Sequence, residues 1–267
     1  MDILAAWSAS SPIVAAFLAS LLGGFVATSV GALPVLFIGK LSPRTSNSML
    51  ALAAGVMLAA TIFSLLVPGY ELAVQMLDST KLAALGVVIL MMLGGLGMGA
   101  LHRFLPHEHF SKGHEGPERS RMAQVWLFVL AIAIHNFPEG LAMGVGAASG
   151  DARVGLGVTL GIGMQNVPEG LAVAMALLGL GYDRLQALAV ASLTGAIEVF
   201  GGLVGAGLLS LSQTLLPAAL ALAAGTMLFV ISDEIIPETH RAGYGDSATA
   251  ALFVGFGLMF FLDVALA

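Results

Sequence analysis

Cysteine and charged residues are what this sequence lacks most. Its 267 residues include no cysteine, which excludes disulfides, thiolate zinc sites and thiol catalysis. Lysine, arginine, aspartate and glutamate make up 10% of the chain, whereas soluble globular domains carry about 25%. Such a chain cannot cover itself with a solvated surface. With 58% hydrophobic residues and a mean hydropathy of +0.97, the chain fits the class of membrane proteins.

Basic residues are scarce as well. The chain has 10 Lys and Arg against 16 Asp and Glu, and this net charge of −6 disfavours nucleic acid as a partner. Residues 1–12 contain no Lys or Arg, so the positively charged start of a signal peptide is missing. The apolar run that follows, residues 13–38, reaches spanning length. We therefore expect it to be an uncleaved first transmembrane helix.

Long apolar runs, by contrast, fill the chain. Gly and Pro are frequent, at 34 and 10 residues, as is typical of membrane helices. Runs of about 20 apolar residues, the length needed to span a bilayer, alternate with polar turn segments. We predict an all-α fold with eight transmembrane helices, forming a single domain over residues 1–267. The predicted helices lie near residues 13–39, 47–73, 81–104, 122–148, 153–180, 185–211, 215–238 and 248–266.

The positions of the cations predict the orientation. Eight of the 10 Lys and Arg residues fall in the loops that follow the first, third, fifth and seventh predicted helices, and only Lys81 and Arg153 fall on the opposite side. Cytoplasmic loops collect cations, so both termini are expected to face away from the cytoplasm. The loop of residues 105–121 is then cytoplasmic. Because imidazole binds zinc, His107 and His109 in this loop are either a weak receiving site for metal or part of a solvated linker.

Two pairs of segments repeat within the chain. His135-Asn-Phe-Pro-Glu-Gly-Leu-Ala and Gln165-Asn-Val-Pro-Glu-Gly-Leu-Ala agree at six of eight positions, in successive helices that run in opposite directions. Ala51-Leu-Ala-Ala-Gly-Val-Met-Leu and Ala221-Leu-Ala-Ala-Gly-Thr-Met-Leu agree at seven of eight, again in antiparallel helices. Together they predict a 3+2+3 inverted repeat around a central pair of helices. Such repeats, with sites at the midplane, are typical of secondary transporters.

Ionisable residues in the predicted spans mark the candidate site, because they are costly there and are usually functional. His135 and Glu139 are four residues apart and share one helix face, and Gln165 and Glu169 repeat that spacing. Glu198 lies near the centre of the sixth predicted helix. Imidazole, carboxylate and amide oxygen together suit a borderline cation such as zinc.

Further residues near this centre are open to two interpretations. Asn136 comes directly after His135, and Asn166 comes directly after Gln165. Each is therefore rotated away from the shared helix face and could serve a neighbouring site. Met57, midway along the second predicted helix, could add a thioether, although an ordinary core methionine is the better interpretation of its position alone.

Acidic residues also gather near the helix ends. Asp233, Glu234 and Glu238 form either an acidic mouth that attracts cations at the cytoplasmic side or a solvated helix end. Asp263, near the outer end of the last predicted helix, could concentrate cations at the entrance.

These motifs resemble those of the ZIP (Zrt/Irt-like protein) family of metal transporters. The resemblance covers the whole chain: the His135-Asn-x-Pro-Glu-Gly signature with its partner at Gln165, the eight spans, the outward termini and the His-bearing loop. It is strongest to prokaryotic members with a two-metal centre. It implies uptake of Zn2+, and of related ions such as Cd2+, through the bacterial inner membrane. It further implies a homodimer in membrane lipid and an elevator-like motion of helices 1, 4, 5 and 6 against the others.

The resemblance also implies two metal sites. One would be formed by Met57, His135, Glu139, Gln165 and Glu169, and the other by Asn136, Glu139, Asn166, Glu169 and Glu198. Asp is common in prokaryotic members at the position of Asn166. With Asn there, three carboxylates face two dications and leave a formal charge of +1, so we expect a weaker second site.

Other functions are less consistent with the sequence. A helical zinc protease needs His-Glu-x-x-His, but Asn136 follows His135 here and Glu139 stands in place of the second His, so we expect no enzyme. A passive channel with the same ligands, or a carrier working in the efflux direction, stays open as an alternative. The sequence also leaves the coupling ion undecided, as well as the choice among zinc, cadmium, iron, manganese and cobalt.

Overall fold

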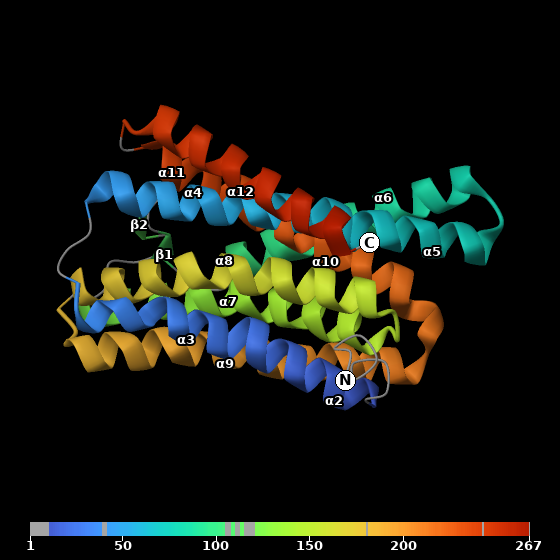
Figure 1. The fold of residues 1–267 in the computed structure, drawn as a ribbon, viewed down its shortest axis with the longest axis horizontal. Helices are drawn as coiled ribbons and strands as arrows, with labels where there is room; N and C mark the ends of the chain where they lie inside the picture. Colours follow the sequence, from blue (N-terminus) through green and yellow to red (C-terminus); the bar gives the residue numbers. More distant parts are fainter. Residues whose placement is uncertain are drawn as a thin grey trace.

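The protein is described here by a computed structural model, which covers residues 11–38, 42–104, 108–109, 113–114, 121–179, 181–241 and 243–266. Long helices run roughly side by side along the longest axis of the molecule (Figure 1). All-helical architecture is thereby confirmed, apart from one small hairpin. Its two-residue strands, β1 (Glu108–His109) and β2 (Gly113–His114), pair antiparallel within the segment that we expected to be a loop.

The helical elements follow one another along eight stretches of the described chain. In order they are α2 (Pro12–Ala19), η1 (Ser20–Val26), α3 (Ala27–Ala32) and η2 (Leu33–Leu36); α4 (Pro43–Ala60), η3 (Thr61–Leu66) and α5 (Val67–Leu77); α6 (Thr80–Phe104); α7 (Arg121–Ala148); α8 (Ala152–Gly179); α9 (Arg184–Leu211); η4 (Gln213–Leu215), α10 (Leu216–Val230), η5 (Ile231–Ile235) and α11 (Ile236–Arg241); and α12 (Gly245–Leu266).

Local sequence explains where several helices begin and end. Ser11 and Ser42 each precede a proline and accept a hydrogen bond from a backbone N–H of the first turn. Asp183 and Gln186 form a reciprocal capping box at the start of α9. Asp78 ends α5 in the left-handed conformation, with a φ of 48°. These caps satisfy backbone groups that the helix itself leaves unpaired.

Three of the helical stretches contain a π-helical segment. These segments are η1, η3 and η5, and each lies inside an otherwise α-helical stretch. The stretch formed by α4, η3 and α5 therefore runs from residue 43 to residue 77, beyond the expected 47–73 at both ends. A π-turn changes which residues face a neighbouring helix and often occurs at functional sites.

Glycine sets the packing of α4 on α12 and of α6 on α10. A Cβ atom added at Gly55 would overlap a backbone carbonyl of α12, and one added at Gly255 would overlap a carbonyl of α4. Gly94 and Gly225 are related in the same way across α6 and α10. Only glycine lets two helix backbones approach this closely, as in membrane helix pairs generally.

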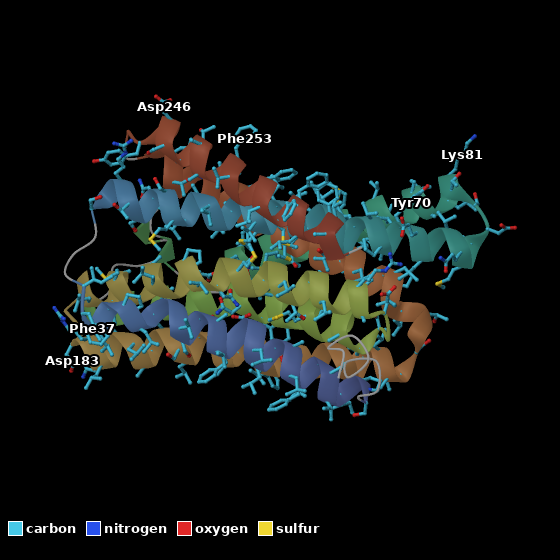
Figure 2. The ribbon with its side chains drawn as sticks, in the orientation of Figure 1. Phe37, Tyr70, Lys81, Asp183, Asp246 and Phe253 are labelled. Atoms are coloured by element: carbon cyan, nitrogen blue, oxygen red, sulfur yellow. The ribbon has the colours of Figure 1, made fainter. Side chains whose placement is uncertain are left out.

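The outer surface of the molecule is apolar. Large exposed hydrophobic side chains include Leu96, Phe253 and Phe261, at 65, 70 and 66% exposure, and Phe253 extends away from α12 (Figure 2). In the described chain, six helical stretches are long and apolar enough to cross a membrane. α7 and α8, at 28 residues each, are also long enough to cross a membrane. The apolar surface supports a multi-pass membrane protein.

We expect Gly94→Ala to destabilise the protein, because the added methyl group meets the backbone of α10. Overpacking of this kind costs about 1–3 kcal/mol. Gly97→Ala is the matched control, since Gly97 lies on the same helix but faces open space. Melting temperatures of the purified proteins in detergent test this. Equal melting temperatures for the two variants would contradict the tight α6–α10 contact.

Candidate metal centre

Buried polar side chains from three helices meet in the middle of the apolar bundle. Asn136 and Glu139 come from α7, Gln165 and Asn166 from α8, and Glu198 from α9. All five are at most 2% exposed. Polar groups are rarely buried this deeply unless they are paired or hold a ligand.

The local sequence brings these helices together at the site. Gly140 follows Glu139 directly, and a Cβ there would overlap the backbone carbonyl of Glu198 on α9. Gly170 follows Glu169 in the same way, and its Cβ would overlap the carbonyl of Thr28 on α3. The Pro-Glu-Gly sequence therefore places each glutamate beside a close backbone contact between its helix and another.

Two asparagines bind the carboxylate of Glu198. Nδ2 of Asn166 donates to Oε2 of Glu198 at 2.8 Å and to the backbone oxygen of Gly23 at 2.8 Å. Nδ2 of Asn136 donates to Oε1 of Glu198 at 3.3 Å. The carboxylate also lies against Gly24 in η1, where an added Cβ would stand 3.0 Å from Oε2. Glu198 thus links α7, α8, α9 and the first helical stretch.

On the opposite side of the cluster, fewer of the buried polar atoms make hydrogen bonds. Among the described residues, Oε2 of Glu139, both polar atoms of the Gln165 side chain, and Oδ1 of Asn136 and of Asn166 are buried without a well-formed hydrogen bond, although Gln165 lies beside the Glu139 carboxylate. Glu139 lies close enough to Glu169 and Glu198 for the three carboxylates to repel one another. An unpaired buried polar group costs about 1–3 kcal/mol, and repulsion between carboxylates adds to this. A bound cation would relieve both costs.

Acidic and histidine side chains alone do not complete a site in the described part of the chain. No group of three or more His, Asp or Glu side chains there is placed to hold a metal ion. A site at this place would therefore need the amides, and also His135. The backbone of His135 lies in α7, but its side chain is outside the described part. His107 and the side chains of His109 and Glu234 are outside it too.

Met57 is 1% exposed and belongs to the main apolar core, which also contains Met143 and Ile162. Its backbone oxygen accepts a hydrogen bond from Thr61 Oγ1 at 2.7 Å. This is the environment of an ordinary core methionine, and it leaves the thioether close to the helices that carry the cluster.

A cavity lies towards one end of the bundle. Its volume is about 400 Å³, and four charged residues are among those that line it: Glu71 from α5, Asp151 from the turn before α8, Arg153 from α8, and Asp263 from α12. Asp263 accepts a hydrogen bond from Ser64 Oγ at 3.1 Å. The structure thus brings Asp263 together with Glu71. Asp151 lies in a turn between two predicted helices, where the sequence carries no sign of a cavity.

The other acidic group lies on η5 and α11, at the end of the molecule away from α5 (Figure 1). Asp233 and Glu238 are half-buried there. His240 on α11 joins this end to α12, because its Nε2 lies 3.0 Å from Thr249 Oγ1. The two acidic groups are therefore at opposite ends, with the buried cluster between them.

Known proteins resemble this chain over most of its length. The family described as "ZIP Zinc transporter" matches residues 105–263. The protein named zinc transporter ZIPB, from Bordetella bronchiseptica, is 49% identical over 243 residues, which cover 91% of this chain and 79% of that protein. Zinc transporter GufA of Myxococcus xanthus is 46% identical over 252 residues, covering 94% and 99% of the two chains. Zinc transporter ZupT of Shigella dysenteriae is 30% identical over 245 residues, covering 88% and 91%.

Proposed function

Because this chain belongs to the ZIP zinc transporter family, we propose that it carries Zn2+ across a cell membrane and into the cytoplasm. Related dications such as Cd2+ are expected to share the pathway. The observation that carries the proposal is the buried cluster of Glu139, Gln165, Asn166 and their neighbours. It combines repelling carboxylates with unpartnered amide oxygens inside an apolar bundle. Such a cluster suits a cation as cargo.

The eight helical stretches are proposed to span the membrane as a 3+2+3 inverted repeat. Glycine positions support this. Gly55 and Gly225 are 170 residues apart, as are Gly31 and Gly201, and each meets a backbone carbonyl of another helix. The π-helical segments η3 and η5 begin at residues 61 and 231, which is the same separation. Equivalent positions in the two halves thus make equivalent contacts.

The orientation follows from the charge distribution. Lys81 lies at one end of the molecule, and Asp183 and Asp246 lie at the other (Figure 2). The helices α4 and α9 begin at the end that carries Asp183 and Asp246, with Arg44 and Arg184 in their first turns. The cation-rich end is proposed to be cytoplasmic, with both termini outside. The relatives in Bordetella and Myxococcus favour a bacterial inner membrane. The homodimer is proposed from the family resemblance alone.

We propose the following path for the ion. A hydrated dication enters the cavity lined by Asp263, Glu71 and Asp151, and then exchanges water for the ligands of the central cluster. The glutamates bind metal only as carboxylates, so any protons on them must leave first. Release then takes place towards Asp233 and Glu238, and onwards to the histidines of residues 105–121.

The close packing of the helices supports an elevator-like motion. We define the transport group as residues 12–36 and 121–211, and the frame group as residues 43–104 and 216–266. At the described glycines, every overlap between backbones falls within one group. Between the groups, Gly157 and Gly161 meet only side chains. Interlocked backbones move together, whereas a contact made by side chains can slide.

The central cluster is tested by zinc uptake into liposomes. We expect His135→Ala and Glu169→Ala to abolish uptake of labelled zinc, because each removes a proposed ligand. Asp246→Asn, in the first turn of α12, should leave uptake unchanged. Undiminished uptake by both ligand variants would contradict the proposed centre.

The elevator motion is tested by a disulfide in this cysteine-free chain. A Cβ at Gly157 would lie 3.7 Å from the Cβ of Ser64, close to the mean of about 3.8 Å in disulfides. We expect oxidised Ser64→Cys/Gly157→Cys to stop zinc uptake, because it joins the two groups. Reduction should restore it.

The control for that disulfide joins α7 to α8 within the transport group. Gly146→Cys/Val158→Cys suits this purpose, since a Cβ at Gly146 would lie 3.4 Å from that of Val158. Uptake through this oxidised variant should continue. Full uptake through the oxidised Ser64→Cys/Gly157→Cys variant would instead favour a passive channel.

A further inference from the structure

The orientation of the Asn166 amide is fixed by its neighbours. One atom of this amide lies 2.8 Å from the backbone oxygen of Gly23 and 2.8 Å from Oε2 of Glu198. A carbonyl oxygen can only accept hydrogen bonds, so the atom facing Gly23 must be the amide nitrogen. Its two hydrogens then serve the two acceptors, and the amide oxygen points elsewhere.

Asn136 is oriented in the same way towards the other carboxylate oxygen of Glu198, with its amide nitrogen facing that oxygen. Its Nδ2 donates to Oε1 of Glu198 at 3.3 Å. Both oxygens of Glu198 therefore accept a hydrogen bond from an amide nitrogen, and both amide oxygens are left buried without a hydrogen-bond partner in the described structure. The two asparagines stand with their positive ends against Glu198 and their negative ends free to face a cation.

From this arrangement we propose that the centre holds one divalent ion per chain and that Glu198 is a positioning residue, not a ligand. The inference rests on the proposed function. The NH2 group of Asn166 lies between Glu198 and the Gly23 carbonyl, so a second cation bound through this oxygen of Glu198 would have to displace it. Glu139 and Glu169 together carry two negative charges, which balance one dication.

Asn166 is the residue that decides the number of ions. Asn166→Asp removes the NH2 group and leaves oxygen atoms of three groups around one point: the new carboxylate, Glu198 and the Gly23 carbonyl. Two carboxylates and a carbonyl without a donor between them repel one another and attract a cation. The variant should therefore gain the second metal site that the wild-type chain lacks.

The test counts zinc ions bound to the purified full-length chain by equilibrium dialysis and mass spectrometry of the metal. We expect one ion per wild-type chain and two per Asn166→Asp chain. Combining Asn166→Asp with Glu198→Gln should return the count to one. Two ions on the wild-type chain would overturn the inference, and this result does not depend on whether any variant folds. A single ion on a folded Asn166→Asp chain would overturn it as well.

Glu198→Gln in the otherwise wild-type chain tests the positioning role. Loss of a partner that orients metal ligands typically lowers metal affinity 10–100-fold without removing the site. We expect one ion to remain, with affinity reduced by about that factor, and Glu198→Asp to recover part of the loss. Complete loss of zinc in a folded Glu198→Gln chain would show Glu198 to be a ligand and overturn the proposal.

Failure of the proposed function gives a different result. A folded wild-type chain that bound no zinc would contradict both the proposed function and this inference. Zinc binding that survived Glu139→Gln unchanged would contradict the proposed centre and the inference built on it. Two ions on the wild-type chain that are both lost in Glu139→Gln would overturn only the inference and leave the proposed function intact.

Discussion

A polar group in the middle of an apolar bundle has no water to bind, so it needs a partner in the protein or in the cargo. The side chains of the central cluster fall into two sets, those with partners in the protein and those without. Glu198 has its partners, since Asn136 and Asn166 donate to its two oxygens and Gly24 of η1 packs against it. Glu139 and Gln165 retain atoms without a hydrogen-bond partner among the described residues. The satisfied side holds the helices together, and the unsatisfied side is where a dication gains most from binding.

Glycine makes this cluster possible. Where two helix backbones touch, the side chain beside the glycine lies at the contact, and the Pro-Glu-Gly sequence buries Glu139 in this way and leaves Glu169 half-buried. The same contacts lock helices into two groups. Because the acidic cavity is lined from both groups, with Asp151 on one and Asp263 on the other, a motion between the groups would reshape the cavity. The contacts that pack the helices into two groups therefore also determine how the cavity can open and close.

Much of the fold can be read from the sequence, because an apolar chain leaves few alternatives. Helix is one of only two structures that satisfy the backbone in lipid, and the long apolar runs indicate where helices lie. Repeats and buried charge also drew attention to Glu139, Gln165, Glu169 and Glu198. The π-helical segments could not be foreseen, since they depend on how each helix meets its neighbours. Asp151 was missed because a turn residue shows no sign of the cavity that it lines.

The sequence by itself determined the membrane class, the helices and the polar residues on them, because composition and periodicity act locally along the chain. Only the tertiary structure decided which atoms of those residues face one another. Spacing placed Asn136 and Asn166 beside the carboxylates, but it could not say whether their oxygens or their nitrogens point at Glu198. That choice depends on the Gly23 carbonyl, which reaches Asn166 across 143 residues of chain and only by the packing of η1 against α8.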